Sequence, residues 1–260
     1  MSKKTFWLSQ LNNIYYPNYF SNNMRKTNNE KSSLTNDKNA SVSSKKIVST
    51  IDEQFTHSSK SETLSDCPVF EKASTLRDLR SNMSKVNFPF KKQANTMVFA
   101  DGNENSSLML IGEAPGKDED QQGKPFVGES GKLLEEMLNA AGIFRKNYYI
   151  TNVVPWRPPS NRTPTVEEIN IMRPYIINHI EIIHPKIVVL IGSVAYRAVM
   201  NSMKAITTVR GEFINIDGIL YLPIFHPSYL LRSPSKKKEM WSDILALKHK
   251  LREIDPIYDH

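Results

Sequence analysis

The sequence predicts an α/β fold in which helices cover a parallel sheet on both faces. Short apolar runs of strand length alternate with longer segments whose apolar residues recur at helical spacing, as in βαβ units. Three of these runs, 108–111, 148–151 and 221–225, each stop at a polar group. Because ligands bind beyond the carboxyl ends of parallel strands, we expect these polar groups to meet in one crevice.

The first half of the globular part begins with a predicted helix and continues with predicted strands and a second helix. Predicted in order are a helix over 76–86, a strand over 96–100 with a turn at Asp101-Gly102-Asn103, a buried strand over 107–111, a helix over 130–141 ending at Gly142, and a strand over 148–153. A Pro-rich loop over 155–164 follows.

The second half opens with a capped helix. Thr165 and Glu168 have capping-box spacing, and Pro174 is expected to bend or split the helix that they start. The remaining predicted elements are a strand over 186–191, a helix over 194–201, strands over 213–216 and 219–224 around a type I′ turn at Asp217-Gly218, and a closing helix over 237–253.

The composition divides the chain into two parts. Residues 1–74 are rich in Ser, Asn, Lys and Thr and lack any helical or strand period, so we expect a disordered tail followed by a single domain over 75–260. The aromatic patch at 14–20 fits a short helix or docking peptide, or simply an apolar piece of this tail.

Charge and cysteine content limit the partners. A net charge of +7 favours an anionic partner such as nucleic acid, although solvated surface lysines also account for it. The one cysteine, Cys67, excludes an intrachain disulfide and a cysteine-based metal site. No apolar run has transmembrane length and no secretory signal is evident, so we expect a cytoplasmic protein without a membrane partner.

Two candidate ligand-binding segments follow the run 108–111. The turn Gly112-Glu113-Ala114-Pro115-Gly116 would let backbone N–H groups approach a ligand, or is an ordinary strand-to-loop turn. It matches neither a Walker A loop nor a dinucleotide fingerprint. Phe126, between Gly123 and Gly128, is either a platform that stacks on a planar base or a core residue.

Asn152 ends the next strand and offers one acceptor and two donors, which suits a C=O/N–H edge. The alternative is an Asn that caps its own loop. Arg157 and Arg162 in the following loop are candidates for phosphate binding, or are merely solvated.

His226 stands at the end of the last strand, before a Pro-Ser turn, where an imidazole is better placed for chemistry than for structure. The segment continues as Ser228, Tyr229, Leu230, Leu231 and Arg232. Leucines on a surface loop that ends in Arg are unusual, and their exposed side chains are expected to wedge into a base stack.

Together these segments resemble the uracil-DNA glycosylase superfamily, and family 4 of bacteria and archaea most closely. The runs that carry the resemblance are GEAPGKDEDQQGKPFVGESGKLL, YYITNVVPWRPPSNRTPT and HPSYLLR. The resemblance covers residues 76 to 260 and implies a three-layer α/β/α sandwich with a central four-stranded parallel sheet. The implied activity is hydrolysis of the N-glycosidic bond of uracil in DNA by base flipping, which leaves an abasic site.

The resemblance also implies roles for individual residues. Glu113, Asn152 and His226 are the expected catalytic residues, and Phe126 and Asn152 fall at the stacking aromatic and the base-reading amide. Gly112 and Ala114 are added as base-binding candidates because their turn offers backbone N–H groups. The residues Ser228, Tyr229, Leu230, Leu231 and Arg232 follow the last motif and fall at the positions that enter the DNA minor groove. Arg157 and Arg162 are DNA-binding candidates by their residue type rather than by the resemblance. The expected partner is uracil-containing DNA, bound by a monomer in a bacterial cell.

The chain departs from the family at the cofactor. Family 4 enzymes hold a [4Fe–4S] cluster on four Cys, and the matching positions here are Lys85, Phe88, Trp156 and Met172. Iron–sulfur clusters need thiolate ligands, so we expect no cofactor and no metal, with apolar side chains filling the space. The alternative function is a non-catalytic or partner-docked DNA-binding member of the superfamily.

Overall fold

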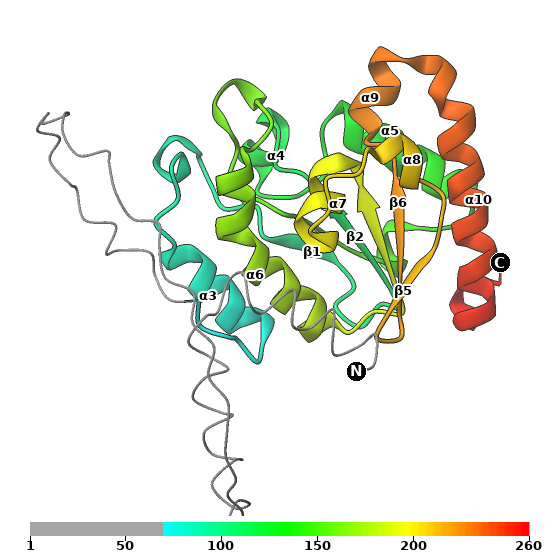
Figure 1. The fold of residues 1–260 in the computed structure, drawn as a ribbon, viewed down its shortest axis with the longest axis horizontal. Helices are drawn as coiled ribbons and strands as arrows, with labels where there is room; N and C mark the ends of the chain where they lie inside the picture. Colours follow the sequence, from blue (N-terminus) through cyan, green and yellow to red (C-terminus); the bar gives the residue numbers. More distant parts are fainter. Residues whose placement is uncertain (1–69, 260) are drawn as a thin grey trace, which may run out of the picture. The chain divides into compact units, whose positions relative to one another are not determined.

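The structure, a computed structural model, describes residues 70–259, which contain one six-stranded sheet (Figure 1). The strand order is β1-β3-β2-β4-β6-β5. The strands are β1 (Ala100–Gly102), β2 (Leu108–Gly112), β3 (Tyr149–Asn152), β4 (Ile187–Ile191), β5 (Ile214–Ile216) and β6 (Ile219–Ile224). The chain passes from β2 to β3 on one side and then crosses to β4 on the other, which makes the carboxyl end of β2 a topological switch point.

The four central strands, β3, β2, β4 and β6, run parallel, and the predicted four-stranded parallel sheet is confirmed. The edge strands β1 and β5 are antiparallel to their neighbours. β5 and β6 form the predicted hairpin, and both Asp217 (φ 51°) and Gly218 (φ 88°) have the positive φ angles of a type I′ turn.

Helices cover both faces of the sheet, as the three-layer prediction requires. The α-helices are α3 (Leu76–Lys85), α4 (Lys117–Gln122), α5 (Glu129–Ala140), α6 (Val166–Ile183), α7 (Gly192–Met200), α8 (Ile206–Val209), α9 (Pro227–Arg232) and α10 (Lys237–Ile254). The 3-10 turns are η1 (Lys91–Gln93), η2 (Arg145–Asn147), η3 (Pro159–Asn161), η4 (Pro234–Lys236) and η5 (Pro256–Tyr258).

The core consists of two apolar clusters, one on each face of the sheet. In β2, Met109 and Ile111 join the cluster under α3, α6 and α7, whereas Leu108 and Leu110 join the cluster under α5, α9 and α10. Successive side chains of a strand point to opposite faces, so a strand buried on both faces is apolar at every position. Figure 1 shows α3 and α6 together on one side and α10 on the other.

Several predicted elements differ from those observed. The strand predicted at 96–100 is wrong, because β1 spans Ala100–Gly102 and includes the first two residues of the predicted turn. Gly102 (φ 99°) permits this pairing, since a Cβ there would lie 2.1 Å from the Tyr148 carbonyl oxygen.

Thr165 and Glu168 form the predicted capping box of α6, and Pro174 does not split that helix.

Residues 70–74, which the composition assigns to the tail, contact α6. The backbone of Ala73 exchanges hydrogen bonds with the Asn178 carboxamide of α6, at 2.8 and 3.1 Å, and the ring of Phe70 meets that of Tyr175 edge-on. Residues 70–74 therefore pack on the domain rather than belong to a tail. Residues 1–69, with the 14–20 patch and Cys67, lie outside the described residues. Within 70–259 no helix is both long and apolar enough to cross a membrane.

Candidate active site

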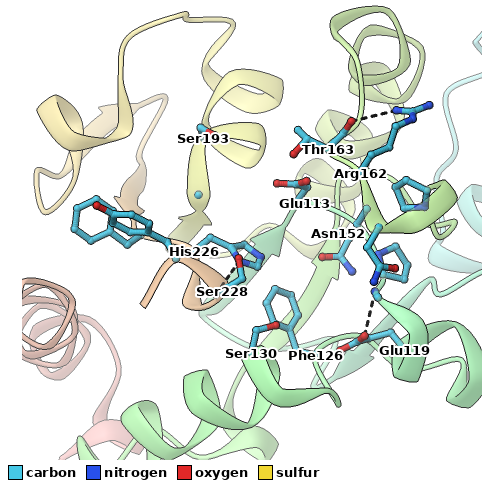
Figure 2. Close-up of a pocket in the computed structure, with 18 of the residues that line it drawn as sticks. Glu113, Glu119, Phe126, Ser130, Asn152, Arg162, Thr163, Ser193, His226 and Ser228 are labelled. Atoms are coloured by element: carbon cyan, nitrogen blue, oxygen red, sulfur yellow. Dashed lines mark hydrogen bonds between the residues drawn. The ribbon is translucent and has the colours of Figure 1, made fainter. Parts of the chain in front are cut away.

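A cavity of about 650 Å³ opens beyond the carboxyl ends of the parallel strands (Figure 2). Its lining includes Glu113 after β2, Asn152 at the end of β3, Ser193 in α7 after β4, and His226 after β6. Three strand ends thus bring a carboxylate, a carboxamide and an imidazole to one crevice, as the polar groups after the three apolar runs predict. The hydroxyl of Ser193, at a fourth strand end, was not predicted.

Phe126 forms one wall of the cavity. It has a positive φ of 57°, and its backbone packs so closely on α5 that a Cβ at Gly131 would lie 2.2 Å from the Phe126 carbonyl carbon. Its ring is buried, with 6% exposure, and lies 6.2 Å from the His226 ring, centroid to centroid. The backbone and the ring of Phe126 are therefore both held in place by packing.

Asn152 lies beside this ring. A Cβ on Gly112 would stand 2.3 Å from Phe126 Cζ and 2.4 Å from Asn152 Oδ1, so Gly112 leaves the space that the phenyl ring and the carboxamide share. Asn152 is 3% exposed, and its carboxamide accepts and donates no hydrogen bond among the described residues. A buried amide without a protein partner at a cavity wall is suited to a polar ligand.

His226 presents one defined nitrogen to the cavity. It caps α9, and its Nδ1 accepts a hydrogen bond from the Ser228 backbone N–H (3.2 Å) and lies 2.8 Å from Ser228 Oγ. A ring nitrogen that accepts carries no proton, so the neutral ring is protonated on Nε2. Burial, with a smaller contribution from the charge of Arg232, lowers the pKa of His226 to about 4, which keeps the ring neutral at physiological pH.

Glu113 is the second titratable group of the cavity. Burial raises the pKa of this carboxyl above its ordinary value, while a hydrogen bond with Thr163 and the charge of Arg232 offset part of the effect. Thr163 belongs to the Pro-rich loop, so this loop reaches across to the acid at the end of β2 (Figure 2).

Glu119 in α4 is a site residue that sequence reasoning missed. Its Oε2 accepts from the Gly116 N–H (3.0 Å), and its Oε1 accepts from the N–H groups of Val127 (3.0 Å) and Gly128 (2.8 Å). One buried carboxylate therefore ties the turn after β2 to the segment that carries Phe126. Its place three residues after Gly116 is a capping-box position, the signal that could have revealed it.

The segment after His226 is a helix, α9, and not the predicted loop. Leu230 is fully buried in the core, so the expectation of an exposed Leu230 is wrong, because the helix turns it inward. Leu231 is 45% exposed. Ser228, Tyr229 and Arg232 line the cavity.

The two loop arginines have different surroundings. Arg162 lines the cavity and forms two hydrogen bonds with Glu168, of 2.8 and 2.6 Å. Arg157 is not among the lining residues, and its Nε donates to Asn161 Oδ1 at 2.7 Å. Asn161, also at the cavity, has a positive φ of 55°.

Comparison with known proteins accounts for this arrangement. A family model described as the uracil DNA glycosylase superfamily matches residues 99–245, more than half of the chain. The chain belongs to the uracil-DNA glycosylase superfamily. The match spans the whole parallel sheet and every polar side chain placed at the cavity above.

Individual relatives within the superfamily are type-4 uracil-DNA glycosylases. The chain is 42% identical to that of Thermotoga maritima over 151 residues, 57% of this chain and 79% of the relative. It is 39% identical to that of Archaeoglobus fulgidus over 55% of this chain and 75% of the relative. It is 40% identical to that of Saccharolobus solfataricus over 62% of this chain and 78% of the relative.

The residues present do not fit the iron–sulfur cluster that family 4 implies. Lys85 is exposed, whereas Phe88, Trp156 and Met172 are at most 3% exposed and belong to one buried apolar cluster. None of them offers a thiolate, and Cys67 is the one cysteine of the chain. Within residues 70–259 no group of three or more His, Cys, Asp or Glu side chains is placed to hold a metal ion.

Replacing Gly112 by alanine is expected to reduce kcat/KM for the site's reaction on the order of 10²-fold, because the new methyl would displace both the Phe126 ring and the Asn152 amide. The control is Gly218→Ala, in the β5–β6 turn, where a Cβ meets nothing within 4 Å. This control is expected to lower the unfolding midpoint and leave kcat/KM unchanged. Equal losses of kcat/KM in the two variants would contradict the assignment.

Proposed function

We propose that this chain is a uracil-DNA glycosylase that turns deoxyuridine out of the DNA, hydrolyses its N-glycosidic bond and leaves an abasic site. The observation that carries the proposal is the shared cavity of Phe126, Asn152, Glu113 and His226 in a member of this superfamily. A base inside the stack is inaccessible, and a mispaired uracil is the least costly to extrude.

Recognition of the base is assigned to Phe126 and Asn152. The Phe126 ring stacks on the extruded pyrimidine. The Asn152 amide donates to uracil O4 and accepts from N3–H, and its freedom from protein partners supports this role. Cytosine reverses the donor and acceptor on that edge and would leave buried groups unpaired, so it is rejected.

Departure of the base is assigned to His226. As the bond breaks, negative charge grows on uracil O2, and the neutral ring donates from Nε2 to that oxygen. The hydrogen bond from the Ser228 N–H supports this assignment because it fixes the tautomer before the substrate arrives. A donor held in place in this way requires no reorganisation in the transition state.

Glu113 is assigned to the stabilisation of the positive charge that develops on the sugar. The sugar becomes oxocarbenium-like as uracil leaves, and a negative charge beside it lowers the barrier. Two carboxylates line the cavity, and backbone N–H groups occupy both oxygens of Glu119. Glu113 is therefore the carboxylate left to stabilise the sugar or to hold the attacking water against it.

The grip on DNA is assigned to the rim of the cavity. Arg157, Arg162 and Arg232 would neutralise phosphates without reading sequence, and the α9 segment would enter the minor groove. Exposed Leu231, rather than buried Leu230, is the wedge that replaces the extruded base. We further propose that the chain acts as a monomer on cellular DNA, in the bacterial cytoplasm, and without a metal or other cofactor.

The titration of His226 is a direct prediction of this scheme. The ring is expected to keep the Nε2–H tautomer through the ordinary value of 6.5 and to take up a proton only near 4, as followed by NMR of the ring nitrogens. Because the unfolded chain protonates near 6.5, the free energy of unfolding should fall as the pH decreases from 6.5 to 4. His226→Gln should remove part of that slope; a ring that titrates near 6.5 would contradict the scheme.

The activity test uses matched oligonucleotides that contain either uracil or thymine at one position. After incubation with the protein, alkali cleaves any abasic site, and cleavage is expected only in the uracil strand. Folded protein that binds these oligonucleotides in a gel shift but leaves uracil in place would instead support a non-catalytic or partner-docked member of the superfamily.

A further inference from the structure

Three buried aromatic side chains, Phe88, Phe90 and Trp156, contact one another and form an aromatic clamp. The Phe88 ring meets Phe90 edge-on at 4.8 Å and lies 5.3 Å from the Trp156 ring. Each is at most 3% exposed. The clamp thus joins the segment that follows α3 to the start of the loop 155–164.

Arg162 connects the clamp to the cavity. Its guanidinium carbon lies 5.3 Å from the centroid of the Phe90 ring, and its nitrogens pair with the buried carboxylate of Glu168. A cation held between an aromatic face and a carboxylate has little freedom to move. Phe90 and the first turn of α6 therefore hold the loop from two sides.

The part of the loop that is held is the part that lines the cavity. Pro158, Asn161, Arg162 and Thr163 all lie on its wall, as does Glu113, whose pKa Thr163 helps to lower. At the beginning of the loop, the Pro155 carbonyl accepts from the Val98 N–H at 2.8 Å. Trp156 lies in the loop between Pro155 and Arg162, and its ring contacts Phe88 within the clamp.

Two of the three clamp residues, Phe88 and Trp156, occupy positions that match cluster ligands in family 4. We propose that the aromatic clamp takes the place of the iron–sulfur cluster: it holds the loop 155–164 against the catalytic cavity, with Phe90 as a positioning residue, and it makes the protein independent of iron. The proposal rests on the proposed glycosylase function for its kinetic readout only.

The first experiment measures iron. The full chain, produced in iron-rich medium and purified without oxygen, is expected to contain substoichiometric iron and to lack broad visible absorption. Prolonged treatment with an iron chelator should change neither its unfolding midpoint nor its rate of uracil excision. Stoichiometric iron with visible absorption, or a midpoint that falls with chelation, overturns the proposal.

The second experiment measures how firmly the loop is held. Trypsin can cut after Arg162, whereas Pro158 protects the bond after Arg157. Phe90→Ala is expected to speed cleavage after Arg162 and to lower kcat/KM for uracil excision on the order of 10- to 10²-fold, because displaced loop residues misplace the cavity wall. Phe90→Leu, which keeps the apolar volume, should restore most of both properties.

The matched control is Leu251→Ala on α10, a fully buried residue of the opposite core cluster. It should lower the unfolding midpoint and leave both kcat/KM and the Arg162 cut unchanged. If Phe90→Ala and Leu251→Ala give the same cleavage rate at Arg162 when compared at equal stability, the clamp has no positioning role.

The iron content and the rate of proteolysis are measured without any enzymatic reaction. They therefore test the clamp even if the wild-type protein does not excise uracil. That failure would refute the glycosylase function alone.

Discussion

Replacement of His226 by alanine is expected to lower kcat for uracil excision roughly 10²- to 10³-fold, or about 2.7–4 kcal/mol, with little change in KM. The imidazole makes its main interaction with charge that appears on uracil O2 only as the bond breaks. Loss of a contact made mainly in the transition state lowers kcat and kcat/KM together. Single-turnover excision from a uracil-containing duplex measures the effect.

The control for this variant is His249→Ala, since the His249 side chain is 80% exposed on α10. It should retain the wild-type kcat. His226→Gln tests the donor itself, because a carboxamide N–H restores a hydrogen bond to O2 without an ionisable group, and it should recover part of the lost rate. If His226→Ala excises uracil as fast as the wild type, the assigned role is wrong.

Asn152→Asp is expected to reduce kcat/KM on the order of 10²- to 10⁴-fold. The substitution keeps the size of the side chain but removes the N–H that would donate to uracil O4, and it places a negative charge beside that oxygen. The O4 group left without a donor costs about 1–3 kcal/mol, and the repulsion between the carboxylate and O4 adds to this loss, whereas N3–H keeps an acceptor. Steady-state kinetics on uracil-containing single strands measures the loss without the cost of opening a duplex.

Asn139→Asp, at an exposed position on α5, introduces the same change in charge away from the cavity and should leave kcat/KM unchanged. The unfolding midpoint of Asn152→Asp is expected to fall, because the variant buries a carboxylate that has no cation beside it among the described residues, so kcat/KM is measured well below that midpoint. Wild-type kcat/KM in this variant would remove Asn152 from base recognition.

The positions of the principal site residues could be predicted because each stands where an apolar strand ends. Register pairs Gly112 with Asn152 across β2 and β3, and Ile191 with Ile224 across β4 and β6. In a parallel sheet, strand ends in register share one edge, so residues 113, 152 and 226 had to come together. The apolar runs and the order of strands and helices are enough to predict that these residues meet, and the packing of side chains need not be known.

What could not be predicted depends on contacts between distant segments. In the sequence, Glu119 is the middle one of three consecutive acidic residues, and residue type alone does not distinguish it from the other two. Only the fold brings the Val127 and Gly128 amides to its carboxylate. The sequence Pro-Ser-Tyr-Leu-Leu-Arg is short enough for loop or helix, and its helical form turns Leu230 into the core. β1 is set by the approach of Gly102 to the backbone of the neighbouring strand, which no local pattern records.

The cavity is assembled from residues as distant as Glu113 and Arg232, which meet only after β6 has paired beside β4. β6 is the last parallel strand to leave the ribosome, so a nascent chain holds its acid and amide long before its imidazole. No shortened fragment lacking β6 should retain partial turnover. The rate of excision in a refolding mixture is therefore proportional to the number of fully folded molecules. The increase of this rate with time measures the final step of folding.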